Sequence, residues 1–139
     1  MLWATRQGCH VDRTACIWLI RRHIDPDAEF RFVRDAAEAP SGAELFDVAG
    51  ARLSHREEDC SLETFLKEYD LAGDPVLHEI SEIVHDADLM DDRYGRPESE
   101  GLDAVIRGMQ LALPDDGALT RHTDVIFDGL YAYLRRETL

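Results

Sequence analysis

The sequence predicts an α/β or α+β fold in which a small sheet from the N-terminal strands packs with at least four helices. Two observations support this prediction. The first third of the 139 residues alternates short β-like runs with one helix, and the remainder carries apolar residues at helical spacing. A chain of this length fits one domain, so residues 1–139 are expected to share a single core.

Three short runs near the N-terminus are expected to form the strands. Leu2–Arg6 is the first, and Gly8 supplies the turn that follows it. Ala28–Val33 is the second, because its first five residues alternate apolar and polar side chains, as in a strand with one buried face. The compact apolar run Leu45–Val48 is the third. Together these runs predict the small sheet.

The first two predicted helices follow polar residues that favour a helix start. Asp12 is expected to cap a helix that runs to about Ile24, where the following Asp-Pro dipeptide at Pro26 ends it. Ser61 is expected to cap a second helix that continues through about Tyr69.

The C-terminal half is predicted to be mainly helical. Asp74 provides a capping carboxylate and Pro75 stands at the first helical position, which is a strong start signal. Pro114 separates two further helices. Their apolar faces consist of Leu102, Val105, Ile106, Met109 and Leu113 in the first, and of Leu119, Ile126, Phe127, Leu130 and Leu134 in the second.

The net charge, the length of the apolar runs and the cysteine pattern argue against several classes of protein. The chain has 15 basic and 29 acidic residues, a net charge of −14 that repels phosphate backbones, so no nucleic-acid binding by this chain alone is expected. The longest apolar run, Ala15–Ile20, is far shorter than the ~20 residues of a membrane span. The N-terminus lacks the pattern of a signal peptide, and the three cysteines form no C-x-x-C pair. These features predict a cytoplasmic protein without membrane contact.

The densest group of potential metal ligands lies between His55 and Asp88. His85 and Asp88 are three residues apart on a predicted helix, so they can converge on one ion. Asp86 points roughly 160° away from Asp88 and joins the site only if the helix ends or unwinds there. We predict a site for a divalent transition metal (Zn, Mn, Fe or Ni), with His55, Glu63 and His85 as core ligands and Asp88 or Asp86 next. The alternative, that His55 lies in a loop and Glu63 only complements a helix dipole, stays open.

Two further features have both a functional and a structural interpretation. Cys60 precedes a predicted helix, and the dipole of that helix favours a reactive or metal-binding thiolate. The structural interpretation is that Cys60 is an inert buried thiol. Arg6 and Arg13 flank the turn after the first strand, where α/β folds collect anions, so they are candidates for binding an oxyanion. The structural interpretation is that Arg13 pairs with a nearby carboxylate.

Several separate motifs occur in the same order as in one known family. They are Thr5-Arg6, Val11-Asp12-Arg13, Ala15–Arg22, Ile24-Asp25-Pro26, Phe46-Asp47-Val48, His55, Asp59–Glu63, Ile83–Leu89, and Glu98 with Gly101. These motifs cover roughly residues 3–108 and resemble the ChrB-type chromate resistance domain.

The resemblance implies a bacterial protein with a role in chromate resistance, a stress response. It also implies that longer relatives carry an additional N-terminal region linked to regulation of a chromate-efflux operon, for which this chain has no room. The ligand cluster between His55 and Asp88 predicts a metal-binding domain. A metalloenzyme that acts on or near an oxyanion such as chromate is one form of this prediction, and the sequence leaves open whether the domain is catalytic. The alternative is a non-catalytic domain that senses chromate or another oxyanion, or has a regulatory role, and lacks the DNA-binding region. The resemblance assigns no catalytic residue.

Overall fold

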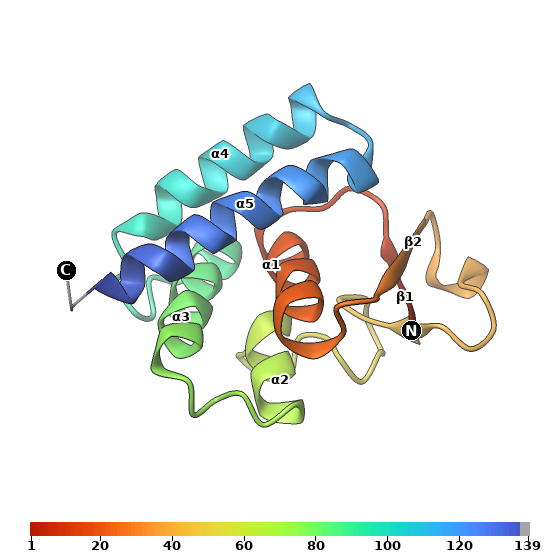
Figure 1. Cartoon of the computed structure of the whole chain (residues 1–139), viewed down its shortest axis with the longest axis horizontal. Helices are drawn as coiled ribbons and strands as arrows, with labels where there is room; N and C mark the ends of the chain where they lie inside the picture. The colour runs from red at the N-terminus through yellow and green to blue at the C-terminus, as the bar shows by residue number, and fades with distance from the viewer. Residues whose placement is uncertain (137–139) are drawn as a thin grey trace.

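A three-stranded parallel sheet and five α-helices make up the structure, a computed structural model that describes residues 1–136. Figure 1 shows the sheet at one end of the molecule, α1 in the middle, and α4 and α5 side by side along one flank. The elements are β1 (Leu2–Arg6), α1 (Val11–Leu19), the π-helical turn η1 (Ile20–Ile24), β2 (Glu29–Val33), the 3-10 turn η2 (Ala36–Glu38), β3 (Glu44–Leu45), α2 (Ser61–Glu68), α3 (Pro75–Leu89), α4 (Glu98–Ala112) and α5 (Asp116–Leu134).

The sheet confirms the three predicted strands, although β2 begins one residue later than predicted, at Glu29, and β3 is shorter. Its order is β2-β1-β3, with β1 pairing parallel to both neighbours. The third strand covers only Glu44–Leu45 instead of Leu45–Val48, although Phe46 still forms an isolated bridge to Leu53. The strand ends here because Asp47 has a φ of 52°, a left-handed conformation that does not continue an extended chain.

Helix α1 is buried along nearly its whole length and differs from the prediction at both ends. It begins at Val11, so His10 rather than Asp12 occupies the N-cap position. The side chain of Asp12 reaches α2 instead and bonds to its first N–H groups. Regular α-helix ends at Leu19, and the predicted continuation to Ile24 is a π-helical turn.

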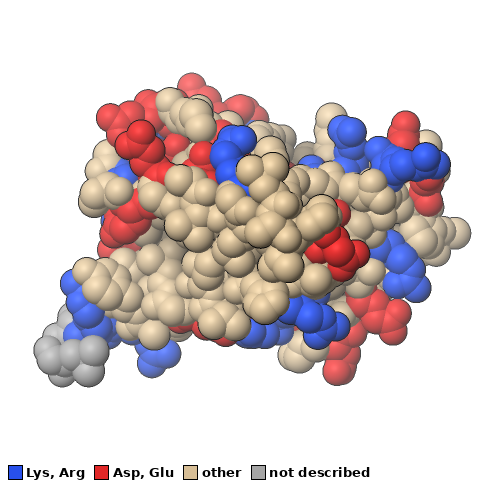
Figure 2. Space-filling view, turned by 90° about the horizontal axis from the view of Figure 1, so that it is seen from above, with Lys and Arg blue, Asp and Glu red and all other residues tan. Residues whose placement is uncertain are grey.

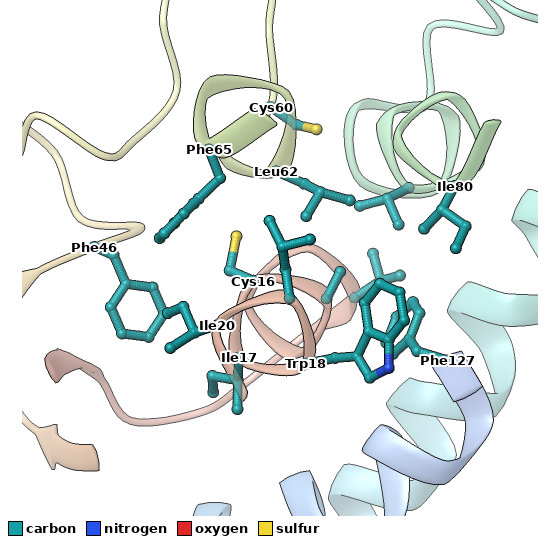
Figure 3. Close-up of a cluster of buried hydrophobic side chains, with 14 of the residues drawn as sticks. Cys16, Ile17, Trp18, Ile20, Phe46, Cys60, Leu62, Phe65, Ile80 and Phe127 are labelled. Carbon is teal, nitrogen blue, oxygen red and sulfur yellow. The ribbon is translucent and has the colours of Figure 1, made fainter. Parts of the chain in front are cut away.

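The core forms around α1, where it contacts α2, α3 and α5 (Figure 3). Trp18 of α1 packs against Phe127 of α5, with ring centroids 5.8 Å apart. Its indole N–H donates a hydrogen bond of 2.8 Å to Asp128, so the polar end of this large buried ring is satisfied. On the other side of α1, Phe65 of α2 lies against Phe46.

The later helices begin at or close to the predicted residues. Cys60 rather than Ser61 is the N-cap residue of α2. The Ser61 hydroxyl donates a hydrogen bond to Asp47 instead, and the Ser61 N–H donates one to Asp12. Asp74 caps α3 through the N–H groups of residues 76 and 77, and Pro75 is its first residue, as predicted. Within residues 1–136, every helix is too short or too polar to cross a membrane.

Candidate metal centre

A pocket of about 570 Å³ lies at the carboxyl ends of strands β1 and β3. In open α/β sheets this edge is where ligands usually bind. The pocket is lined by Gly8, His10, Arg13, Asp47, Val48, Ala49, Gly50, Ser54, His55 and Asp88. Its walls therefore come from the turn after β1, the loop after β3 and the end of α3.

One imidazole nitrogen in this pocket is surrounded by carboxylates. His55 Nε2 lies 3.1 Å from Asp12 Oδ2, 3.3 Å from Asp88 Oδ2 and 3.9 Å from Asp47 Oδ1. The ligand atoms of Asp12, His55 and Asp88 all lie within 4.8 Å of one another. Adjacent ligands of an ion with metal–ligand bonds of 2.0–2.2 Å are separated by about 3.3 Å in tetrahedral geometry. The three side chains thus have the spacing of a coordination sphere.

Asp12 is held in place by the start of α2. Its Oδ2 accepts the Ser61 N–H at 2.8 Å, and its Oδ1 accepts the Leu62 N–H at 3.0 Å. These N–H groups belong to the first turn of α2, where no partner exists within the helix itself. The carboxylate is buried, with 3% of its side chain exposed. A single side chain thus fixes α1 against α2 and contributes one carboxylate to the centre.

Asp47 is fixed by three separate interactions. Its Oδ1 accepts the Ser61 hydroxyl at 2.6 Å, and its Oδ2 accepts Arg13 Nε at 2.8 Å. The Asp47 carbonyl accepts a second guanidinium nitrogen of Arg13 at 2.9 Å. These contacts hold Asp47 in its left-handed backbone conformation, which costs free energy in a non-glycine residue and is frequent at functional sites.

The charges of the pocket favour bound positive charge. Hydrogen bonds to Asp12 and Asp88 raise the pKa of His55 to about 10, although partial burial opposes the shift. Burial, and then the neighbouring charge of Asp12, raise the pKa of Asp47 to about 6, against the lowering effect of Arg13. Each shift has the direction expected where several carboxylates share one partly buried space.

Glu63 and His85, two of the predicted core ligands, belong to a second and more deeply buried cluster. His85 Nδ1 lies 2.5 Å from Glu63 Oε1, and its Nε2 lies 2.9 Å from Asp91 Oδ2. Glu63 also accepts the Cys60 N–H and the Tyr94 hydroxyl. Burial lowers the pKa of His85, but its bonds to Glu63 and Asp91 outweigh that effect and raise it.

The structure therefore divides the predicted ligands between two places. Among residues 1–136, each compact group of ligand atoms contains either His55 or His85, and none contains both. A separation of 2.5 Å between Glu63 and His85 matches a strong hydrogen bond and is shorter than the distance between two ligands of one ion. Only His55 and Asp88 of the predicted ligands line the pocket.

Asp86 and Cys60 have well-defined structural contacts. Both oxygens of Asp86 accept the Tyr94 N–H, and one also accepts the Arg96 N–H, so this carboxylate shapes the loop between α3 and α4. Cys60 is fully buried, and burial raises the pKa of its thiol well above the ordinary value. This environment favours the inert interpretation of the thiol, although its sulfur lies in the same group of ligand atoms as Glu63 and His85.

Of the two arginines that are candidates for binding an oxyanion, Arg13 lines the pocket and Arg6 does not. Arg13 lines the pocket, but its guanidinium donates to Asp47 and to the carbonyl oxygens of Arg6, Gln7 and Gly8. The side chain of Arg6 is exposed and does not contribute to the lining. These contacts favour the ion-pair interpretation of Arg13, and the oxyanion role of both residues stays a prediction.

Sequence reasoning missed Asp12 and Asp47 as members of the centre. From the sequence, Asp12 is expected to cap its own helix, and Asp47 lies inside an apolar run that is expected to form a strand. A usable signal was present, because both residues closely follow strands of a parallel sheet, whose carboxyl ends meet at one edge.

Comparison with known proteins agrees with the motifs noted in the sequence. Residues 3–134 match the family model described as "ChrB, C-terminal domain". The chain is 38% identical over 133 residues to Protein ChrB of Cupriavidus metallidurans. This match covers 94% of the chain and 40% of that relative, so the chain spans well under half of the relative's length. No solved structure gives a significant match. The chain belongs to the family of ChrB C-terminal domains.

Proposed function

We propose that this chain is a metal-binding domain that takes part in chromate resistance. The link with chromate rests on the family to which the chain belongs and on the motifs that carry the resemblance. The metal-binding part rests on the pocket at the carboxyl ends of β1 and β3.

The observation that carries the metal site is the surrounding of His55 Nε2 by three carboxylates. Asp12 and Asp88 lie at 3.1 and 3.3 Å from this nitrogen, close to the separation of two ligands of one ion, and Asp47 is at 3.9 Å. The four residues come from α1, from the loop that connects β3 to α2, which holds both Asp47 and His55, and from α3. Side chains from three segments of the chain converge on this one point.

The charge of the site supports a divalent ion in particular. The site contains the carboxylates of Asp12, Asp47 and Asp88 and the guanidinium of Arg13. Its net charge is therefore −2 when the His55 imidazole is neutral, which is the form that binds a metal ion. A divalent ion balances this charge. An imidazole combined with carboxylates suits Zn²⁺, Mn²⁺, Fe²⁺ or Ni²⁺ better than Ca²⁺, which prefers oxygen ligands alone.

The open side of the pocket supplies space for a further ligand. His55 is about half exposed, with 47% of its side chain accessible, and Asp88 is partly exposed. A bound ion would hold water there, or a small oxyanion such as chromate, as an additional ligand. In this proposal an oxyanion binds to the ion, while Arg13 keeps Asp47 in place. Glu63 and His85 then act as positioning residues that hold α3 against α2.

The proposal is tested by titrating the metal-free chain with Zn²⁺ and Mn²⁺ by calorimetry. We expect one site per chain in the wild type and a loss of affinity of about tenfold or more in His55→Gln and in Asp88→Asn. His10→Gln is the matched control, because His10 lines the same pocket but lies outside every group of converging ligand atoms among the described residues.

Two results would contradict the proposal. One is unchanged metal affinity in His55→Gln and Asp88→Asn. The other is the absence of stoichiometric binding in the wild type. The oxyanion part has a separate readout: chromate should shift the thermal unfolding of the metal-loaded chain. His55→Gln should remove that shift, while Arg34→Gln, at an exposed arginine outside the pocket, leaves it unchanged.

A further inference from the structure

A second pocket, of about 290 Å³, lies where α3 meets α4, next to the loop that joins these helices. Its lining combines four carboxylates with an apolar surface and consists mainly of Asp86, Ala87, Met90, Asp92, Glu100 and Asp103. It shares no residue with the pocket at the ends of β1 and β3. Figure 2 shows Asp and Glu side chains gathered at the upper left of its view, the end of the molecule where α4 begins in Figure 1.

A buried carboxylate of this pocket has one oxygen without a hydrogen-bond donor. Asp103 has 10% of its side chain exposed, and its Oδ2 accepts a hydrogen bond of 2.8 Å from Arg107 Nε. Its Oδ1 is buried and has no partner among residues 1–136, a state that only one other buried side-chain atom shares, Asp124 Oδ1. A buried acceptor that has lost its bonds to water costs free energy until a donor replaces them. A donor from a ligand in the pocket would remove this cost.

The basic side chains around the pocket do not neutralise its carboxylates. Arg96 also lines the pocket, but its guanidinium nitrogens lie 3.3–3.5 Å from carboxylate oxygens of Glu79, Glu82 and Glu98. Asp92 and Glu100 are exposed, and neither pairs with a Lys or Arg of the described residues. Glu100 precedes Asp103 by three residues on α4, so their side chains are neighbours on one face of the helix. A bound positive charge would therefore meet carboxylates that have no other counter-charge.

The spacing of these carboxylates suits a cation with separate charges better than a single metal ion. Where three ligand atoms of residues 1–136 lie within 4.8 Å of one another, none of them belongs to Asp92, Glu100 or Asp103. An ion with bonds of about 2.0–2.6 Å would therefore not reach three such side chains at once. Ala87 and Met90 line the same pocket, and Met90 is 66% exposed, so a hydrocarbon chain would find apolar contacts there. Ammonium groups joined by methylenes match both features.

We propose that this pocket binds a short aliphatic polyamine. One ammonium group donates hydrogen bonds to Asp103, a second donates to Glu100, and the methylene chain between them packs against Met90. Hydrogen bonds between charged groups are roughly twice as strong as those between neutral ones, so these contacts supply both affinity and orientation. A lysine side chain carries the same ammonium group but only one of them. It satisfies one of the two carboxylates and binds more weakly.

Calorimetric titration of the metal-free full chain with spermidine tests the proposal at about 0.15 M NaCl, where attraction between distant surface charges is largely screened. We expect one site per chain, and a dissociation constant raised about tenfold or more by Asp103→Asn and by Glu100→Gln. Glu100 is exposed, so its variant tests the site even if the Asp103 variant is destabilised. Circular dichroism confirms that each variant is folded.

Two variants with the same loss of charge are the controls. Asp124→Asn changes the other carboxylate that has a buried oxygen without a partner, and this residue does not line the pocket. Glu29→Gln changes an exposed carboxylate on β2. Both should bind spermidine as tightly as the wild type. Equal weakening in the controls would indicate general attraction of a polycation to an acidic protein and would overturn the proposal.

Two further ligands identify the chemistry that the pocket recognises. N-acetyl-lysine amide, with its single ammonium group, should bind about tenfold more weakly than spermidine or worse, and Mg²⁺ at equal concentration should not displace spermidine. Equally tight binding of the lysine derivative would point to a lysine side chain of another protein, and displacement by Mg²⁺ would point to a metal site. Either result, or no stoichiometric binding of spermidine to the wild type, would overturn the proposal.

Discussion

Asp12 connects helices α1 and α2 with the candidate centre. It accepts two backbone N–H groups of α2 and faces His55, although it lies in the first turn of α1. Leaving a buried N–H without a partner costs about 1–3 kcal/mol. The carboxylate therefore contributes to stability as well as to the proposed metal site.

Replacing this carboxylate should affect stability and metal binding separately. We expect Asp12→Ala to lower the free energy of unfolding by about 2–4 kcal/mol, because two buried N–H groups lose their acceptor. Asp12→Asn should lose less stability, since one side-chain oxygen remains, but should still weaken metal binding. Urea unfolding and metal titration measure the two effects. Asp27→Ala, at an exposed aspartate, is the control, and an equally stable Asp12→Ala protein would contradict the assignment.

At the scale of elements, the loop between α3 and α4 depends on Asp86. Its carboxylate accepts backbone N–H groups of Tyr94 and Arg96 and is buried. We expect Asp86→Ala to cost about 1–3 kcal/mol in urea unfolding without changing metal stoichiometry. A loss of one bound metal per folded chain would instead identify Asp86 as a ligand.

The contact between α5 and α1 should depend on pH through Asp128. Its pKa is lowered, mainly because Arg22 donates hydrogen bonds to it. The carboxylate therefore stabilises the fold fully above the unfolded-state pKa of about 3.9, and this contribution is lost as the pH falls through the lower folded-state pKa.

We expect Asp128→Asn to be less stable than the wild type at pH 7 by about 1 kcal/mol, since the pair is partly exposed and screened by solvent. Below about pH 3 the difference in unfolding free energy should shrink, because the wild-type carboxylate is then increasingly protonated. Urea titrations at both pH values measure this difference. A gap that stays constant or widens at low pH would show that the charge of Asp128 does not stabilise the contact.

The elements themselves could largely be predicted from sequence because their signals are local. Asp74 and Pro75 mark the start of α3, and the period-two pattern after Ala28 marks β2. Long-range contacts had no such signal. His85 and Asp88 are neighbours on α3, yet His85 contacts Glu63 while Asp88 contacts His55. That division depends on how α3 packs against α2, which spacing along one helix does not determine.

At the scale of the whole molecule, a bound ion would join three segments that are distant in sequence: α1, the loop between β3 and α2, and α3. A ligand that binds only the folded state stabilises it by about 2.7 kcal/mol at one hundred times its dissociation constant. We expect saturating Mn²⁺ or Zn²⁺ to raise the unfolding temperature of the wild type, and EDTA to reverse the rise. His55→Gln should show little change. A rise of equal size in His55→Gln would place the stabilising ion elsewhere.

The location of the ion is the most direct test of the proposed metal centre. Anomalous diffraction from crystals grown with Mn²⁺ or Zn²⁺ measures it without reference to any activity. We expect an ion about 2.0–2.3 Å from His55 Nε2 and from carboxylate oxygens of Asp12 and Asp88. An ion bound by Glu63 and His85, or no ion in this pocket at saturating metal, would contradict this prediction.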